Sequence, residues 1–261
     1  MDLDLTGKYA LVGGGSKGLG LASARELAAL GATVTLASRT EADLQKALSS
    51  LPVTAGQQHD YLVLDYDDPE SVRQAVRRRL EQQAYHILVN NTGGPPGGPI
   101  RLARVEEFEV AFRRHLVVNH LLAQLLLPGM RADGYGRIVN VISTSVKQPL
   151  HGLGVSNTVR AAVANWAKTL AAEVAPFGIT VNNVLPGATR TERLESIIES
   201  KTAKSGLTEA ETISAMEAEI PLGRFARPEE FGAAVAFLAS PAASYITGIN
   251  LPVDGGRTGC L

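Results

Sequence analysis

A run of closely spaced glycines near the N-terminus has the clearest chemical potential in this chain. Gly13-Gly14-Gly15-Ser16-Lys17-Gly18-Leu19-Gly20 follows an apolar, strand-like segment and leads into a helical pattern. Glycine permits the positive φ of a tight turn, and its missing Cβ lets a phosphate reach backbone N–H groups at a helix N-terminus. Because the strand-turn-helix context is the one that a dinucleotide-binding loop needs, the sequence predicts a phosphate cradle built from Gly14, Ser16, Lys17, Gly18, Leu19 and Gly20.

Two cations bear on the choice of dinucleotide. Arg39 ends the second predicted strand, where proteins that bind NAD carry an acidic residue for the ribose 2′-hydroxyl. A guanidinium can instead bind a 2′-phosphate in a forked geometry, and Lys17 in the glycine loop would approach the same phosphate. Glu41 is close in sequence but is expected to begin the next helix. The two cations favour NADP(H), and the alternative is that both are solvated surface charges.

Hydroxyl and basic side chains form a second group further along the chain. Ser143 ends an apolar strand pattern, and Ser156 and Arg160 follow it in a helical pattern. Because residues four apart share one face of a helix, Ser156 and Arg160 should line the same pocket. Lys147 and His151 lie between them and Ser143. The unperturbed pKa of His151 suits acid–base work near neutral pH, whereas Lys147 would need its pKa lowered; either can instead be a solvated loop residue.

Further short motifs are distributed along the chain. They are the spacing Gly14-x-x-x-Gly18-x-Gly20, Asn90-Asn91-Thr92-Gly93, Pro186-Gly187 followed by Thr191, Tyr245-Ile246-Thr247-Gly248, and Asp254-Gly255-Gly256. Together they resemble the short-chain dehydrogenase/reductase family, and the whole chain is most similar to its β-ketoacyl carrier-protein reductases. Gly13 for the usual Thr and Thr92 for the usual Ala are small departures. The resemblance implies cofactor contacts from Asp65, Tyr66, Asn91, Gly93, Arg160, Pro186, Gly187, Thr189 and Thr191, and it places Asn119 at the family's catalytic asparagine.

The resemblance breaks at the proton donor. In the family, a Ser at the end of the fifth strand is followed about thirteen residues later by Tyr-x-x-x-Lys, whose tyrosine exchanges a proton with the substrate oxygen. Here Ser143 aligns with that serine, but Ser156 and Arg160 replace Tyr and Lys, and no tyrosine occurs between Tyr135 and Tyr245. The pKa of an aliphatic hydroxyl lies about five or six units above that of tyrosine. Ser156 is therefore a poor acid near neutral pH, which leaves His151 and Lys147 as candidate replacements.

Three functions are compatible with these residues. The first is an NADP(H)-dependent oxidoreductase that acts on a carbonyl or hydroxyl substrate of 3-oxoacyl type with a non-standard active site. The second is a reductase of activated carbon–carbon double bonds, for which a strong acid at oxygen matters less. The third is a catalytically impaired NADP(H)-binding or regulatory protein.

His120 adjoins Asn119 but does not share its helix face, so it is a weak candidate for the proton donor.

The elements that position these residues alternate between short apolar strands and longer helices, which is typical of a parallel sheet covered on both faces. We predict one α/β domain over residues 1–261, a Rossmann-type doubly wound parallel seven-stranded sheet, with residues 190–219 as a substrate lid. The predicted strands are Tyr9–Val12, Thr33–Ala37, Tyr61–Leu64, Ile87–Val89, Arg137–Ile142, Thr180–Val184 and Asn250–Val253. The predicted helices include Leu19–Leu30, Pro69–Gln83, Glu106–Met130, Ser156–Val174 and Pro228–Ala239.

Composition and charge narrow the partners to a small-molecule substrate. A formal net charge of −1 gives no reason to expect nucleic acid or an anionic membrane as a partner. The single Cys260 cannot form an internal disulfide or a cysteine metal site, so no metal is predicted and a reducing, cytoplasmic location is expected. The family resemblance implies a homotetramer, with which the apolar run Leu116–Leu127 and the strand Gly248–Val253 are compatible; both can equally be ordinary core.

Overall fold

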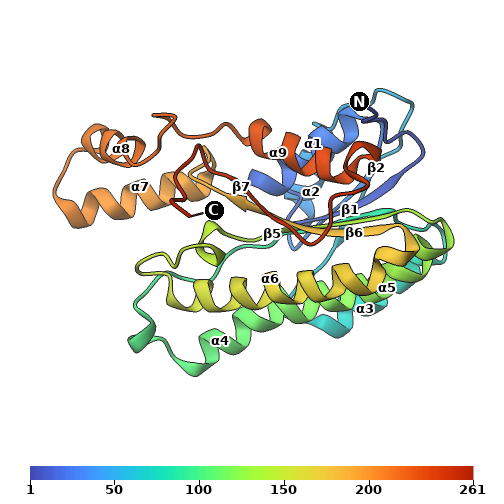
Figure 1. Ribbon diagram of the computed structural model, residues 1–261, viewed down its shortest axis with the longest axis horizontal. Helices are drawn as coiled ribbons and strands as arrows, with labels where there is room; N and C mark the ends of the chain where they lie inside the picture. Colours follow the sequence, from blue (N-terminus) through green and yellow to red (C-terminus); the bar gives the residue numbers. More distant parts are fainter. Residues whose placement is uncertain (261) are drawn as a thin grey trace.

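A seven-stranded parallel sheet forms the centre of the protein, in the order β3-β2-β1-β4-β5-β6-β7 (Figure 1). The computed structural model describes residues 1–260. The order of strands reverses between β1 and β4, and in such sheets ligands bind outside the carboxyl ends of the strands at that point. The predicted fold class is confirmed. The strands are β1 (Tyr9–Gly13), β2 (Thr33–Ser38), β3 (Asp60–Val63), β4 (Ile87–Asn90), β5 (Gly136–Val141), β6 (Ile179–Pro186) and β7 (Asn250–Val253).

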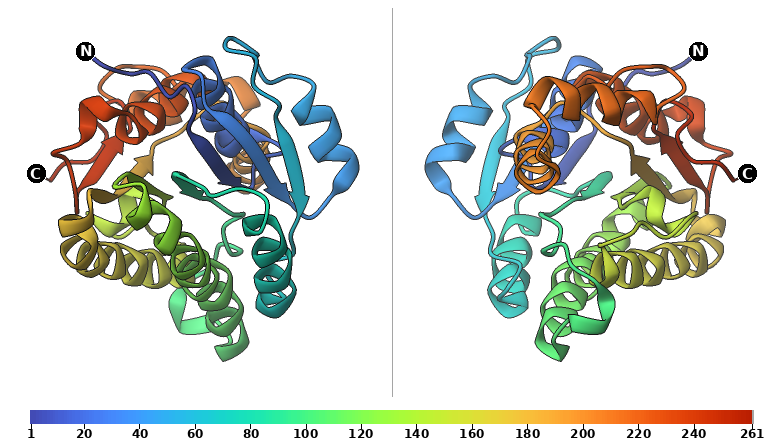
Figure 2. Two further views of the ribbon diagram at one scale, coloured as in Figure 1. Left: turned by 90° about the vertical axis from the view of Figure 1, so that its right-hand side faces the viewer. Right: turned by 90° about the vertical axis from the view of Figure 1, so that its left-hand side faces the viewer.

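Helices cover both faces of this sheet (Figures 1 and 2). One layer contains α1 (Gly18–Ala29), α2 (Glu41–Leu48) and α9 (Pro228–Ala239). The other contains α3 (Pro69–Leu80), α4 (Val105–Phe112), α5 (Val118–Ala132) and α6 (Gly154–Val174). Two more helices, α7 (Glu192–Ser205) and α8 (Glu209–Ala218), project past the sheet after β6 (Figure 1). None of the helices in residues 1–260 has the length and apolar character that crossing a bilayer requires.

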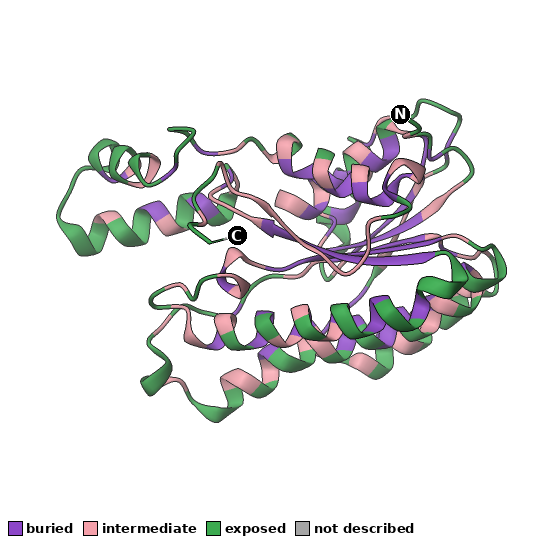
Figure 3. Ribbon diagram, viewed as in Figure 1, coloured by how far each residue is buried: buried purple, intermediate pink, exposed green. Residues whose placement is uncertain are grey.

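Two hydrophobic clusters hold the layers together. Side chains alternate along each strand, so Val12 and Val89 enter the cluster under α1 and α9, while Leu11 and Leu88 enter the cluster over α3 and α5. A sheet that is buried on both faces requires such near-continuous apolar strands. Figure 3 shows the sheet as mostly buried and the outer parts of α7 and α8 as mostly exposed.

The predicted helix Glu106–Met130 is wrong as a single element. The chain forms α4 up to Phe112, a π-helical turn over Arg113–Val117, and then α5 from Val118. A π turn inserts one residue into a helix without ending it, so the apolar spacing on either side is still typical of one helix. Such turns are frequent at functional sites, and this one carries His115 into the interior.

A chain of amide hydrogen bonds crosses four strands. Asn90 Nδ2 donates to Asn140 Oδ1 at 2.8 Å, Asn140 Nδ2 donates to Asn183 Oδ1 at 2.9 Å, and Asn183 Nδ2 donates to Asn250 Oδ1 at 2.8 Å. The four residues are in register on β4, β5, β6 and β7. Asn90 Oδ1, at the end of the chain, is buried and without a partner within residues 1–260. Buried amides are stable in a sheet only when paired in this way.

Candidate active site

The glycine loop joins β1 to α1 at the carboxyl edge of the sheet. Gly14 and Gly18 have φ angles of +55° and +56°, which only glycine adopts without strain. A Cβ on Gly20 would lie 2.1 Å from the carbonyl oxygen of Gly14, so the first turn of α1 packs directly on the loop. No side chain caps the N-terminus of α1, and its first N–H groups remain available to a phosphate. These features fit the pyrophosphate of a dinucleotide.

Lys17, in the same loop, is paired with the start of α7. Its Nζ lies 3.0 Å from Oε2 of Glu192, and both side chains are largely exposed. A Cβ on Gly18 would lie 3.8 Å from Cγ2 of Thr191, the residue that precedes α7. The segment predicted to be a lid therefore touches the phosphate loop, and a phosphate at Lys17 would share that cation with Glu192.

Arg39 stands exposed immediately after β2, and no ion pair involves it within residues 1–260. The nearby Asp67 is held by a hydrogen-bonded ion pair with Arg114, which lowers the pKa of Asp67, and Arg39 adds a smaller effect in the same direction. Asp65 Oδ1 accepts a 3.0 Å hydrogen bond from the backbone N–H of Asp67, which stabilises the loop after β3. Arg39 therefore remains free to bind an incoming anion.

Tyr66 and Asn91 support the glycine loop from the interior. Asn91 Nδ2 donates to the carbonyl of Gly13 at 3.1 Å. A Cβ on Gly13 would lie 2.6 Å from Tyr66 Oη and 2.8 Å from the carbonyl oxygen of Asn91. This contact explains glycine where the family usually has Thr, because the Tyr66 hydroxyl fills the space. That hydroxyl is buried without a partner, and burial raises its pKa above the ordinary range.

The serine at the end of β5 is positioned by the backbone that follows it. Ser143 precedes a 3₁₀ helix over Thr144–Val146, and its Oγ accepts a 3.1 Å hydrogen bond from the N–H of Ser145. This bond uses an acceptor site of the hydroxyl, so the O–H of Ser143 can still donate to a ligand. The hydroxyl of Ser145 is itself buried and unpaired within residues 1–260.

Arg160 is a buried cation without an acidic partner. The residue is 8% exposed, and its Nη1 donates to the carbonyl of Val141 at 3.0 Å. Desolvation lowers the pKa of Arg160 to about 10, so the side chain stays charged at neutral pH. A Cβ on Gly94 would lie 3.8 Å from Arg160 Nη2, which places the guanidinium between the end of β5 and the loop after β4.

His115 occupies the same region from the π-helical turn. It is 2% exposed, and its Nε2 has no hydrogen-bond partner within residues 1–260. Desolvation lowers the pKa of His115 to about 2, the charges of Arg160 and Arg114 act in the same direction, and a backbone hydrogen bond to Gly93 opposes them. The ring is therefore neutral in the folded protein at any physiological pH.

The remaining catalytic candidates lie at different depths. Ser156 is half-buried on α6, one turn before Arg160, as the spacing predicts. His151 is exposed on the turn before α6, and Lys147 is partly buried, with its carbonyl facing Cys260 Sγ at 3.6 Å. Asn119 is buried on α5, two residues after the end of the π-helical turn. Polar contacts within residues 1–260 do not connect Asn119 or His151 to Arg160.

His120, the neighbour of Asn119, faces outward. Its Nδ1 accepts a 3.3 Å hydrogen bond from Trp166 Nε1 at an exposed position. This arrangement agrees with the expectation that His120 and Asn119 lie on different faces of their helix. His120 is therefore well separated in environment from the buried His115 on the preceding turn.

The segment after β6 closes the site from the other side. A Cβ on Gly187 would lie 2.5 Å from Asp254 Cα, so Pro186-Gly187 packs directly against the loop after β7. Thr189 Oγ1 donates to the carbonyl of Gly187, and Thr191 Oγ1 donates to the carbonyl of Thr189, both at 3.3 Å. This short turn leads from the end of β6 toward α7, whose first residues lie beside the glycine loop.

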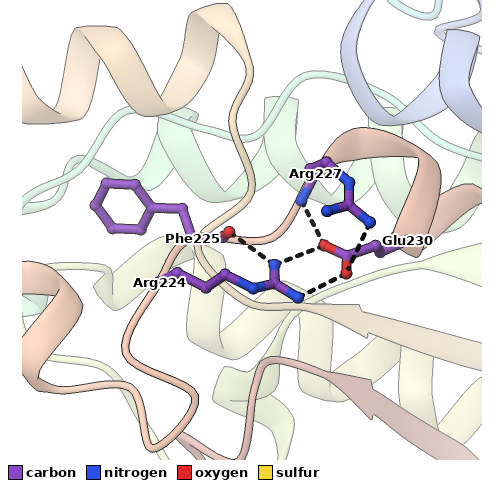
Figure 4. Close-up of polar contacts among 4 residues, drawn as sticks. All are labelled: Arg224, Phe225, Arg227 and Glu230. Atoms are coloured by element: carbon purple, nitrogen blue, oxygen red, sulfur yellow. Dashed lines mark hydrogen bonds and ion pairs between the residues drawn. The ribbon is translucent and has the colours of Figure 1, made fainter.

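A charged network lies between α8 and α9, just after the segment predicted to be a lid (Figure 4). Arg224 donates through both terminal nitrogens to Glu230 at 2.8 and 2.7 Å, and the N–H of Arg227 donates to the same carboxylate at 2.8 Å. These hydrogen bonds lower the pKa of Glu230 to about 2, with the Arg224 bond as the largest cause. Phe225 is buried beside this network with Leu194, Ile198 and Ile220, so the base of α7 is fixed while its far end is exposed.

Sequence reasoning missed two residues of this site, Arg114 and His115. Arg114 ties the π-helical turn to Asp67 near the predicted adenine side, and His115 brings the same turn to Gly93 and Arg160. A signal was available: His115 lies at helical spacing from Ala111 and Val118, both buried apolar residues. A polar residue on the buried face of a helix is unusual and points to a hydrogen-bonding or functional role.

Residues 1–260 contain no group of three or more His, Cys, Asp or Glu arranged to bind a metal.

Comparison with known proteins gives matches along nearly the whole chain. A family profile described as enoyl-(acyl carrier protein) reductase matches residues 14–258. A protein described as a ketoacyl reductase of the monensin polyketide synthase from Streptomyces virginiae is 36% identical, over 96% of this chain and 97% of its own. A 3-oxoacyl-[acyl-carrier-protein] reductase from Vibrio cholerae is 34% identical over 97% and 98%. The structure of L-sorbose reductase from Gluconobacter frateurii with NADPH and L-sorbose superposes with a TM-score of 0.93 at 33% identity, covering 100% of both chains.

Proposed function

Because this chain belongs to the short-chain dehydrogenase/reductase family, we propose that it reduces a 3-oxoacyl-type carbonyl with a non-standard active site. It is an oxidoreductase of that family that uses NADP(H). The observation that supports the proposal best is that a glycine loop fit for a pyrophosphate and the buried, unneutralised guanidinium of Arg160 both lie at the carboxyl ends of the strands. The named relatives act on carbonyl groups, which favours the same substrate class.

Different residues along the carboxyl edge of the sheet would bind different parts of the cofactor. The backbone of the glycine loop would hold the pyrophosphate, and Arg39 with Lys17 would hold the 2′-phosphate. When bound, the reduced nicotinamide supplies a hydride. Thr189 and Thr191 lie on the turn that would close over the nicotinamide end.

Ser143 and Arg160 can stabilise the negative charge that develops on the substrate oxygen. A carbonyl oxygen gains negative charge as it is reduced, and a fixed cation or O–H donor in a water-poor site stabilises that charge. The O–H of Ser143 is available to donate, and Arg160 offers a positive charge that no acid neutralises. The arrangement would therefore stabilise the alkoxide electrostatically, and water would supply the proton that completes the alcohol.

The same unneutralised cation favours a second candidate, the reduction of an activated carbon–carbon double bond. That reaction places negative charge on a conjugated oxygen while hydrogen is added at carbon, so a cation matters more than a proton donor. The description of the matching family profile points in this direction. The two candidates differ in substrate: a saturated 3-oxo thioester is used only by the first, and a conjugated enone or enal is reduced at carbon only by the second.

NADPH oxidation by the purified protein tests the proposal. We expect turnover with 3-oxoacyl thioesters, and a fall of roughly 100-fold or more in kcat/KM in both Ser143→Ala and Arg160→Ala, the size seen when an oxyanion donor is removed. Asn165→Ala, an exposed position on α6, serves as the matched control. Turnover confined to conjugated enones would select the second candidate. NADPH binding without turnover on either class would reject both.

Restoring the family pattern gives a second test. In Ser156→Tyr combined with Arg160→Lys, a tyrosine hydroxyl and an adjacent lysine would face the pocket from one side of α6. We expect carbonyl reduction by the double variant to rise, because the proton donor gains about five or six pKa units of acidity. The initial rate with a 3-oxoacyl thioester is the measurement. A loss of activity would mean that Ser156 or Arg160 has a direct role that the family pair cannot replace.

A further inference from the structure

His115 is a deeply buried polar group near the sheet edge that the proposed chemistry leaves unused. Its ring is 2% exposed, and its Nε2 has no hydrogen-bond partner within residues 1–260. An unsatisfied buried nitrogen costs about 1–3 kcal/mol, and a leucine of similar volume at this position would avoid that cost. A histidine at this position is therefore best explained by a ligand that forms a hydrogen bond with Nε2.

The tautomer of the ring follows from its contacts. The hydrogen bond to the Gly93 backbone involves the other ring nitrogen, because Nε2 is unpaired. That bond raises the pKa of His115, which is the effect of a ring N–H that donates to a carbonyl. A neutral ring with Nδ1 facing this carbonyl would carry its proton on Nδ1 and would present a lone pair at Nε2. The unused group is a hydrogen-bond acceptor.

The charges around His115 keep it an acceptor. Arg160 on α6 and Arg114 on the π-helical turn both act against protonation, and Arg114 is itself paired with Asp67. Gly93 faces the ring from the loop after β4 and contributes only its backbone. No acidic side chain is among the groups that affect the titration of His115. A neutral acceptor beside a buried cation suits an O–H donor and does not suit an anion or a second cation.

We propose that His115 is a positioning residue of the active site, whose Nε2 accepts a hydrogen bond from a water molecule or a ligand hydroxyl held beside Arg160. The inference rests on the proposed function. The π-helical turn places His115 for this role, because Arg114 pairs with Asp67 while His115, the next residue, is buried in the interior. One turn of helix thereby links the loops after β3 and β4.

The test compares His115→Leu and His115→Asn with the wild-type protein, and it uses His120→Leu as a matched control at an exposed histidine. Three quantities are measured: NADP+ affinity by calorimetry, kcat and KM with the best substrate, and the unfolding midpoint. We expect His115→Leu to lower kcat about tenfold, equivalent to one lost hydrogen bond of roughly 1.4 kcal/mol, with an unchanged or higher midpoint. His115→Asn, which can still present an acceptor oxygen, should recover part of the loss.

A structural role predicts the opposite pattern, because a histidine that only packs would lower the midpoint when replaced and leave kcat unchanged. That outcome, or a His115→Leu variant identical to wild type in all three quantities, would overturn the inference. The nitrogen NMR signal of His115 Nε2 separates the two sources of the O–H donor: a hydrogen-bonded shift without ligand indicates water, and a shift that appears only with NADP+ indicates a ligand hydroxyl. A signal that stays unbonded in both states would also overturn it. Wild-type protein that binds no NADP+ would instead reject the proposed function.

Discussion

Buried polar atoms without a partner gather where the strands end. Ser38 closes β2, Asn90 closes β4, and Tyr66 and Ser145 follow β3 and β5, each with an unpaired buried atom within residues 1–260. His115 joins them from the π-helical turn. Native proteins leave few such atoms unsatisfied. Their concentration at one edge, on both sides of the point where the strand order reverses, is what a ligand-binding edge requires.

Arg39 is the residue on which cofactor preference should depend. We expect Arg39→Ala to weaken NADPH binding roughly 10- to 100-fold, because a charge-assisted hydrogen bond contributes about 1.5–3 kcal/mol, and to leave NADH affinity unchanged. Calorimetric titration with both nucleotides measures the difference. Arg104→Ala, another exposed arginine, is the control. Equal weakening of both nucleotides would show that Arg39 does not contact the 2′-phosphate.

At the scale of elements, the amide chain across β4, β5, β6 and β7 should contribute to the stability of the sheet. Asn140→Ala removes two hydrogen bonds and leaves an amide of Asn90 and of Asn183 unpaired in the interior. Each orphaned group costs about 1–3 kcal/mol, so we expect the unfolding midpoint to fall by roughly 10 °C. Calorimetry measures it, with Asn165→Ala as the exposed control. Equal midpoints for the two variants would contradict the role of the amide chain.

The contact between α7 and the glycine loop leads to another prediction. Glu192 holds Lys17 at 3.0 Å, and a bound 2′-phosphate would compete for the same cation. Since an exposed ion pair contributes at most about 1 kcal/mol, Glu192→Gln should tighten NADPH binding by a few-fold and leave NADH binding unchanged. Glu195→Gln, one turn further along α7, is the control. Weaker NADPH binding in Glu192→Gln would mean that the ion pair organises the site and does not compete with the cofactor.

Stability of the whole molecule should depend on pH through the buried His115 and through Glu230, which Arg224 and Arg227 hold. The pKa of His115 is lowered from 6.5 to about 2, so the unfolded chain binds more protons than the folded one between these values. The free energy of unfolding therefore falls as the pH drops below 6.5. The pKa of Glu230, lowered from 4.5 to about 2, adds a loss in the same direction below 4.5.

Unfolding midpoints measured from about pH 7.5 to about pH 5 check the histidine contribution. We expect His115→Leu to lose less stability over this range than the wild-type protein, because it has no buried ring to protonate on unfolding. His120→Leu, at an exposed histidine that accepts a hydrogen bond from Trp166, is the matched control. Parallel curves for all three proteins would mean that His115 titrates alike in the folded and unfolded states.

The apolar run Leu116–Leu127 shows what a sequence pattern predicts about the whole molecule. Leu122 and Leu126 are buried in the core, whereas Val117 on the same run is 43% exposed, beside Phe112 at 44%. The run therefore serves the core and also leaves apolar surface on α4 and the π-helical turn. The homotetramer expected from the family resemblance stays a prediction, which sedimentation of the purified protein would check.

What the linear order of residues determined by itself was the sheet, its helices and the phosphate loop. Apolar periodicity is a local property, and glycine spacing around Gly14 and Gly18 limits the backbone to one kind of turn, so both can be read without knowing what lies nearby. The prediction that Ser156 and Arg160 take the places of the family's tyrosine and lysine also came from the sequence alone. Burial and pairing are different, because they depend on residues that are distant in the chain. Only the tertiary structure turned His115 inward through a π-helical turn, left Arg160 without an acid, and placed Glu192 against Lys17.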